Sequence, residues 1–184
     1  SASLVAEVLY RKFVLVVPLY RQLPSMAQLG YDTSEATLAN WVIKTSELVT
    51  PLSSELHQQL CQGHHLQGDE TPIEFLREPG EAPDSRSYMW VARTPVKQPH
   101  AIVYYAYGAT RSGAFAQRLY QDYQGVLQCD GYSGYNLLTD SVQRMGCWAH
   151  VRRKFYDAVT SHVQGADTPL SLINEMFVLA RERP

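Results

Sequence analysis

The sequence has no long apolar run, no cysteine framework and no excess of one charge. Its longest apolar stretch, residues 13–20, is short and contains Pro18, so no membrane-spanning segment is expected. The three cysteines are an odd number without the spacing of a disulfide-bonded secreted domain, which indicates a reducing, cytoplasmic environment. The net charge of −2 argues against nucleic acid as a partner unless basic residues are concentrated locally.

The composition is that of a folded protein. The chain has 184 residues, 45% of them hydrophobic and 18% charged, which suits one domain or a small domain with an appendage. It begins at Ser1 without an initiator methionine or a signal-peptide pattern, which predicts an excised or processed fragment. Basic charge is indeed local, because Arg152, Arg153 and Lys154 stand in a row. This triplet is typical of a solvated helix face or of a binding surface.

Residues 1–62 have the apolar spacing of helices. Gly30 ends one helical segment, and Asp32 is the expected cap of the next, with an acid three residues later. Pro51 is expected to end that second helix and to separate it from a third. Two helices meeting near Gly30 could form a helix-turn-helix or a plain helical hairpin, and the spacing alone favours the hairpin.

Residues 64–149 change to short runs of aromatic and β-branched residues separated by turn-forming stretches. Three strands in a meander, followed by a strand-helix-strand unit with a right-handed crossover, predict the sheet of a ribonuclease-H-like fold. Helices are expected again from His150. The expected strands are residues 66–76, 88–94, 101–107, 126–129 and 144–149, with a helix over 111–123 and a last helix over 170–180.

Two aspartates are placed where a metal could join them. Asp69 lies in the first expected strand and Asp130 at the end of the fourth. If these strands are neighbours, their backbones are about 4.8 Å apart, and carboxylates at matching heights could share divalent cations. Carboxylate oxygens with water and phosphate suit Mg²⁺, and a metal pair supports phosphoryl transfer. The alternatives are that Asp130, which precedes Gly131, is a turn residue, and that Asp69 lies on an exposed strand edge.

Cys147 and His150 have a spacing that zinc could use. A complete zinc site needs two further ligands, which the cluster from Cys61 to His65 could supply only if the two regions meet. Burial of Cys147 is the simpler expectation, and His150 could instead face a substrate phosphate at the start of its helix.

Several motifs together resemble transposases of the insertion sequence 66 family. They occur in the order of the family and cover nearly the whole chain. The resemblance implies a ribonuclease-H-like fold and DNA strand cleavage and transfer by a DDE triad with Mg²⁺ or Mn²⁺, in which Asp69 matches the first acid and Asp130 the second. The matching stretches are residues 18–21 (PLYR), 36–42 (ATLANWV), 68–72 (GDETP), 111–113 (RSG), 130–135 (DGYSGY) and 146–155 (GCWAHVRRKF).

The resemblance also implies an organisation in three parts. Residues 1–62 would be a helix-turn-helix-like DNA-binding region, with Thr37 and Asn40 as candidate DNA contacts. Residues 63–162 would be an incomplete ribonuclease-H-like catalytic core, and residues 163–184 the start of a helical insertion. The basic segment of Arg152, Arg153 and Lys154 would face DNA through phosphate contacts that carry no sequence information.

The third acid of the triad, a Glu on a later helix, has no matching motif in this sequence. Glu175 and Glu182 stand in the wrong context, and Glu70 is expected to point away from Asp69 because successive strand residues face opposite sides. The chain by itself is therefore expected to have little or no strand-transfer activity.

The sequence thus predicts an α/β protein, with a ribonuclease-H-like mixed five-stranded sheet, flanking helices and an all-helical region before it. The expected partner is double-stranded DNA, both transposon ends and target, in a cytoplasmic, nucleoid-associated protein that forms homo-oligomers at full length. The rival hypothesis is a DNA-binding module without chemistry.

Overall fold

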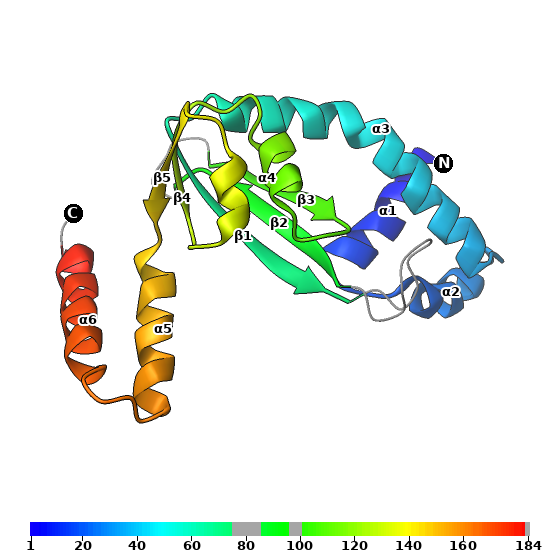
Figure 1. Ribbon diagram of the computed structural model, residues 1–184. Coiled ribbons are helices and arrows are strands. Elements are labelled where there is room, and N and C mark those ends of the chain that lie inside the picture. The colour runs from blue at the N-terminus through cyan, green and yellow to red at the C-terminus, as the bar shows by residue number, and fades with distance from the viewer. Residues whose placement is uncertain (75–85, 96–100, 183–184) are drawn as a thin grey trace. The chain divides into compact units, whose positions relative to one another are not determined.

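The computed structural model describes residues 1–74, 86–95 and 101–182 (Figure 1). By internal contacts the chain divides into two compact units, Ser1–Glu55 and Leu56–Pro184. The boundary lies inside one helix, so that helix contributes residues to both units. Among the described residues, no helix combines the length and the apolar character that crossing a bilayer requires.

Unit 1 is entirely helical, as the sequence predicts. It contains α1 (Ala2–Phe13), α2 (Leu19–Gln28) and most of α3 (Glu35–Cys61). The side chain of Gln22 is buried and donates from Nε2 to the carbonyl oxygens of Val8, at 3.4 Å, and Val17, at 3.0 Å. These bonds join α2 to the middle of α1 and to the segment between the two helices. The small core of this unit is formed by Val8, Leu19, Met26 and Leu38.

Two predictions about α3 are wrong. The helix begins after Ser34 rather than after Asp32, because the Ser34 hydroxyl accepts a hydrogen bond from the backbone N–H of Thr37 at 3.2 Å. The helix also continues through Pro51 to Cys61. A proline removes one backbone donor and crowds the preceding turn. Pro51 lies on the exposed side of a helix of 27 residues, and Leu60 near the helix end is buried in the core of unit 2.

Unit 2 contains the predicted mixed five-stranded sheet, in the order β3-β2-β1-β4-β5. Strand β1 pairs antiparallel with β2 and parallel with β4, while β2–β3 is antiparallel and β4–β5 is parallel. A meander followed by parallel crossovers is the order expected of a ribonuclease-H-like fold. The strands are β1 (His65–Ile73), β2 (Ser87–Arg93), β3 (Val103–Gly108), β4 (Gly125–Cys129) and β5 (Val142–Gly146).

The last predicted strand ends too late. Strand β5 ends at Gly146, and Trp148 already begins helix α5 (Trp148–Thr160), which is followed by α6 (Asp167–Glu182). The predicted helix over residues 111–123 is shorter, as α4 (Gly113–Leu119), since Ser112 caps its start. The turns expected at residues 78–84 and 95–99, and the end of the first expected strand at Leu76, lie wholly or mostly outside the described residues.

One face of the sheet carries the main core. Trp90 of β2 is fully buried and stacks on Phe115 of α4 at a centroid distance of 5.2 Å. The short 3-10 helix η1 (Ser133–Leu137) brings Tyr135 against the same indole ring, edge to face. Together α4 and η1 cover this face, to which alternate strand residues point.

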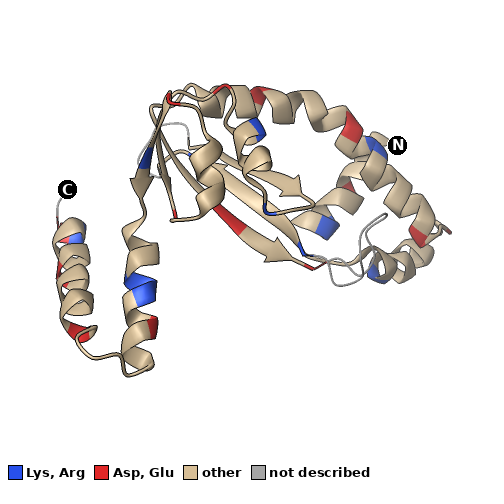
Figure 2. Cartoon of the chain, in the orientation of Figure 1, with Lys and Arg blue, Asp and Glu red and all other residues tan. Residues whose placement is uncertain are grey.

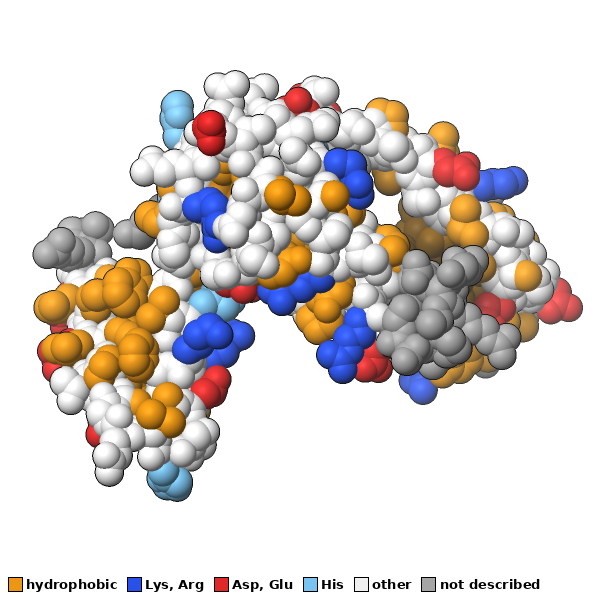
Figure 3. All heavy atoms as spheres, in the orientation of Figure 1, with side chains coloured by type: hydrophobic (Ala, Val, Ile, Leu, Met, Phe, Trp, Pro, Cys, Tyr) orange, Lys and Arg blue, Asp and Glu red, His pale blue; other side chains and the backbone are white. Residues whose placement is uncertain are grey.

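The opposite face of the sheet, which we call the open face, is largely polar or exposed. Strand β1 presents Gln67, Asp69 and Thr71 there, since Leu66, Gly68 and Glu70 between them are buried. Figure 2 shows acidic positions within β1 and basic positions along α5. Helices α5 and α6 form a hairpin, and Figure 3 shows apolar side chains exposed on α6.

Candidate active site

Strand β1 separates two neighbouring acids by its alternation. The Asp69 side chain is 53% exposed on the open face, whereas the Glu70 side chain is fully buried toward the core. A buried carboxylate requires a partner, and an exposed one can bind a ligand. The expectation that Glu70 faces away from Asp69 is therefore confirmed, and the two acids must serve different purposes.

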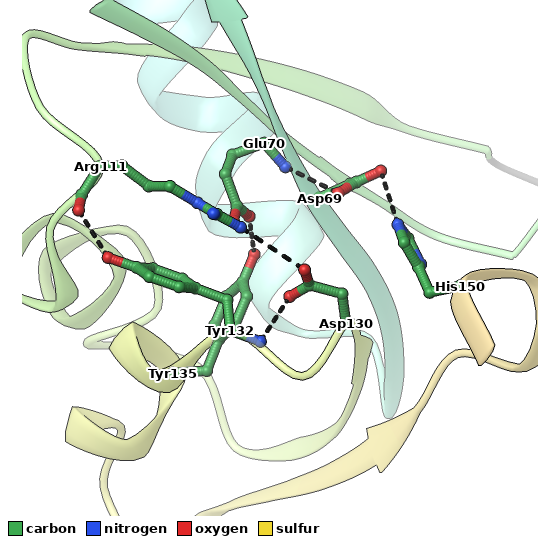
Figure 4. A network of polar contacts seen from close by, with 7 residues as sticks. All are labelled: Asp69, Glu70, Arg111, Asp130, Tyr132, Tyr135 and His150. Atoms are coloured by element: carbon green, nitrogen blue, oxygen red, sulfur yellow. Dashed lines mark hydrogen bonds and ion pairs between the residues drawn. The ribbon is translucent and has the colours of Figure 1, made fainter. Parts of the chain in front are cut away.

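Asp69 lies against the first turn of α5. Its Oδ2 is 3.6 Å from Nε2 of His150, and its Oδ1 accepts the backbone N–H of Glu70 at 3.0 Å. The other ring nitrogen of His150, Nδ1, is buried and has no hydrogen-bond partner among the described residues. His150, considered from the sequence as a residue that could face substrate phosphate, thus lies directly beside Asp69 (Figure 4).

Asp130 follows the last residue of β4 and has both oxygens engaged. Oδ1 accepts the backbone N–H of Tyr132 at 2.9 Å, which is the local turn that an aspartate before glycine favours. Oδ2 lies 3.5 Å from Nη2 of Arg111. The turn interpretation of Asp130 is therefore correct in geometry, and it coexists with a position beside a cation (Figure 4).

The parallel pairing of β1 and β4 sets the relative height of the two aspartates. Gln67 is paired with Gln128, and Gln67 Nε2 donates to Gln128 Oε1 at 2.7 Å. Asp69 and Asp130 each follow two residues later, so continuation of this register brings them to the same height. They line two neighbouring cavities that share Cys147 and His150 as wall residues.

Glu70 belongs to a network that the sequence analysis did not anticipate. Its Oε1 accepts hydrogen bonds from Nε and Nη2 of Arg111 at 2.8 and 2.5 Å. Its Oε2 accepts the hydroxyl of Tyr135 at 2.6 Å. The guanidinium carbon of Arg111 lies 4.0 Å from the ring centre of Tyr132. The one available signal was an acid at a core-facing position of a strand, together with an arginine in a family-like motif.

The protonation of this network follows from its contacts. Burial lowers the pKa of Arg111, but hydrogen bonding to Glu70 and the charges of Glu70 and Asp130 raise the pKa by more, so the guanidinium stays charged. Burial, followed by the neighbouring Tyr120 and Glu70, raises the pKa of Tyr135 far above its ordinary range. Tyr135 therefore remains a hydrogen-bond donor to the Glu70 carboxylate.

The Asp130 cavity is lined by four basic side chains and two carboxylates. The cations are Arg111, Arg144, Arg153 and Lys154, and the second acid is Asp157. The basic triplet lines two cavities. Arg152 and Arg153 line one between α5 and α6, where Arg152 donates from Nε to Oδ1 of Asn174 at 2.6 Å. Arg153 and Lys154 face the Asp130 cavity, and Figure 3 shows basic side chains on α5.

Comparison with known sequences decides the family. The sequence profile of the Transposase IS66 family matches residues 1–183. The chain belongs to the IS66 family of transposases. Two relatives in Sinorhizobium fredii, the uncharacterized proteins y4qI and y4jD, are 29% and 30% identical over 99% of this chain. The chain spans only 36% and 38% of their lengths. No solved structure matches the sequence.

The donor atoms fit the divalent metal that IS66 transposases are expected to use. Asp69 is exposed and Asp130 half-buried, and carboxylate oxygens are hard ligands of the kind that Mg²⁺ and Mn²⁺ bind. In the part of the chain that the structure describes, no three His, Cys, Asp or Glu side chains are grouped to hold a metal. The two aspartates would thus be a partial ligand set. The zinc site considered as an alternative around Cys147 is not formed among the described residues, and Cys147 is half-buried.

The DNA-binding residues expected of an IS66 transposase lie in different surroundings. Thr37 is half-buried, and its hydroxyl is 3.0 Å from the Ser34 hydroxyl within the cap of α3. Asn40 is exposed one turn further along the same helix. Asn40 is therefore free to reach a partner from the surface of α3, whereas Thr37 also serves the helix cap.

Proposed function

We propose that this chain carries the first two acids, Asp69 and Asp130, of a transposase active site that cleaves DNA strands and transfers them to target DNA. The observation that supports this most is the register of β1 and β4, which pairs Gln67 with Gln128, two residues before Asp69 and Asp130. Asp130 lines the basic cavity, and Asp69 lines the neighbouring cavity. Membership of the IS66 family supports the reaction class.

The residues around the two acids prepare them for metal binding. Contact with Nε2 of His150 orients the Asp69 carboxylate, and the N–H of Tyr132 holds one oxygen of Asp130. When bound there, Mg²⁺ or Mn²⁺ would supply Lewis-acid stabilisation of the charge that develops on the reacting phosphate. The basic wall of the Asp130 cavity would attract the DNA backbone toward this metal site.

The DNA-binding part of the proposal involves both units. Double-stranded DNA, as transposon ends and as target, would contact Asn40 and Thr37 of α3 and the basic residues Arg152, Arg153 and Lys154 of α5. The contacts of the basic residues of α5 with phosphates would position the duplex without reading its sequence. We further propose that residues 63–162 form the catalytic core and that the full-length protein acts as a homo-oligomer in the nucleoid-associated cytoplasm.

The chain alone should transfer strands poorly. Glu70 is committed to Arg111 and Tyr135, and Glu175 and Glu182 lie on α6 with no contact to Asp69 or Asp130 in the described part of the chain. None of them serves as the third acid. Robust strand transfer by this chain with Mn²⁺ would contradict that conclusion.

Metal titration tests the assignment of the two acids. Mn²⁺ binding, followed by isothermal titration calorimetry, should weaken at least tenfold in Asp69→Asn and in Asp130→Asn, since each removes a charged ligand. Asp122→Asn, at an exposed position outside both cavities, is the matched control and should bind Mn²⁺ like the unmodified chain. Unchanged binding in both active-site variants, with DNA binding retained, would instead favour a DNA-binding module without chemistry.

A further inference from the structure

Arg111 has more hydrogen-bond donors than the protein uses. A guanidinium carries five N–H groups on a rigid plane. Nε and Nη2 donate to the buried Glu70, and Nη2 also approaches Asp130 Oδ2 at 3.5 Å. Nη1 has no hydrogen bond or ion pair within the described residues. An arginine held on one edge therefore presents its other edge to a ligand.

The guanidinium is fixed before any ligand arrives. Glu70, which holds it, is fully buried and is itself held by the Tyr135 hydroxyl. Tyr132 stacks against the guanidinium, and its hydroxyl donates to the Arg111 backbone carbonyl at 2.5 Å. A surface arginine would lose rotamer freedom on binding, but Arg111 has already lost most of it. Figure 4 shows Arg111 held between Glu70, Tyr132 and Asp130.

The position of Arg111 selects the ligand. Its side chain is 38% exposed in the wall of the Asp130 cavity, where Arg144, Arg153 and Lys154 are the other cations. These four charges exceed those of Asp130 and Asp157, so an anion is the ligand that this wall favours. A planar guanidinium matches two phosphate oxygens at once.

We propose that Arg111 is a phosphate-binding residue, which holds a DNA phosphodiester beside Asp130 while Glu70, Tyr132 and Tyr135 fix its guanidinium. This inference rests on the proposed function, since that function makes DNA the ligand. Contact between Arg111 and a non-bridging phosphate oxygen places positive charge where negative charge grows during phosphoryl transfer. Glu70 and the two tyrosines are positioning residues, because they reach the phosphate only through Arg111.

The salt dependence of DNA binding tests the proposal. Fluorescence anisotropy with a labelled 30-base-pair duplex, at a series of salt concentrations in EDTA and in Mn²⁺, gives both affinity and the number of phosphate contacts. Because Arg111→Met alone would leave Glu70 buried without its cation, the principal variant is Glu70→Gln with Arg111→Met, and circular dichroism confirms its folding. Arg118→Met with Asp122→Asn, at two exposed residues outside the cavity, likewise removes one positive and one negative charge and is the matched control.

The double variant Glu70→Gln with Arg111→Met should bind DNA about tenfold more weakly in Mn²⁺ than its charge-matched control, with a salt slope reduced by roughly one contact. The DNA affinity of Arg111→Lys should lie between those of the double variant and the control. Lysine keeps the positive charge but cannot donate two parallel hydrogen bonds to a phosphate. Equal affinities and slopes for the double variant and the control would overturn the proposal. That result leaves the proposed function standing as long as Asp69→Asn and Asp130→Asn still lose Mn²⁺ binding.

Discussion

Gln67 and Gln128 are hydrogen-bonded across the parallel strands β1 and β4, with Gln67 Nε2 donating to Gln128 Oε1 at 2.7 Å. The oxygen of Gln67 accepts in turn from Nε of Arg93 on β2, also at 2.7 Å. Three side chains on three adjacent strands are therefore joined in a row on the open face. This row lies one pleat before Asp69 and Asp130, and it holds the two strands at the height that the proposed metal ligands require.

Removal of the middle member of the row should affect both stability and metal binding. Gln67→Ala eliminates two side-chain hydrogen bonds, which should lower the free energy of unfolding by about 1–2 kcal/mol. Mn²⁺ affinity should fall several-fold, because β1 and β4 are then less firmly aligned. Urea denaturation and calorimetry measure the two effects. Gln143→Ala, at an exposed position of β5, is the control, and equal behaviour of the two variants would refute the alignment role.

The Glu70–Arg111 pair should show strong coupling. Glu70→Gln leaves the guanidinium without its buried counter-charge, and unfolding should become easier by about 2–3 kcal/mol, a cost moderated by the partial exposure of Arg111. The double variant Glu70→Gln with Arg111→Met should lose less free energy of unfolding than the two single variants lose together. In the double variant neither a buried carboxylate nor a guanidinium is left without its partner. Urea denaturation of the four proteins completes the cycle. Additive losses would mean that the pair does not interact, and Glu74→Gln, an exposed acid, should change little.

Gly68 is required by the close approach of Tyr120. A Cβ at position 68 would lie 2.4 Å from the Tyr120 hydroxyl oxygen, so Gly68→Ala should destabilise the protein by about 1–3 kcal/mol. That hydroxyl is buried without a partner among the described residues, so Tyr120→Phe should be neutral or mildly stabilising. The same change removes the clashing oxygen and should rescue Gly68→Ala. Thermal unfolding measures all three variants, and failure of the rescue would mean that the clash lies elsewhere.

Cys61 should be poorly reactive at neutral pH. Burial, and to a lesser extent the nearby Asp122, raises the pKa of Cys61 to about 11. The thiolate is the reactive form, and at pH 8 only about 0.1% of such a thiol is ionised. Alkylation by iodoacetamide should therefore be slow at pH 8 and accelerate with each pH unit up to about 11. Peptide mass spectrometry follows the rate, and a rate equal to that of free cysteine at pH 8 would contradict the assigned shift.

The strands were predictable because their signals are local. Alternating apolar residues between turn-forming stretches located β2 and β4 to within a residue, and the order of strands and helix gave the mixed sheet. The helix end predicted at Pro51 was wrong because a proline signals only a local cost in the helix. The apolar contacts of Leu60, which stabilise the helix beyond Pro51, are not visible in the local sequence. The expected cap at Asp32 failed because Ser34, two residues later, supplies an equivalent oxygen.

The candidate site was predictable only in part, for a different reason. Asp69 and Asp130 were found from their positions in two expected strands and from family-like motifs. The partners of Glu70, Arg111 and Tyr135, are 41 and 65 residues away in the chain. No local spacing in the sequence could therefore predict these contacts. The role of His150 against Asp69 depended in the same way on where α5 begins, which the sequence placed two residues too late.

The alternation of Asp69 and Glu70 makes β1 intolerant of changes in length. A single-residue deletion between Leu66 and Asp69 could keep the backbone ladder, but every side chain on one side of the deletion would move to the other face. Glu70 would then reach solvent while Arg111 and Tyr135 lost their buried anion. Natural sequence drift in this strand should therefore proceed by substitution, and gaps in alignments of related chains should fall in the connections between strands.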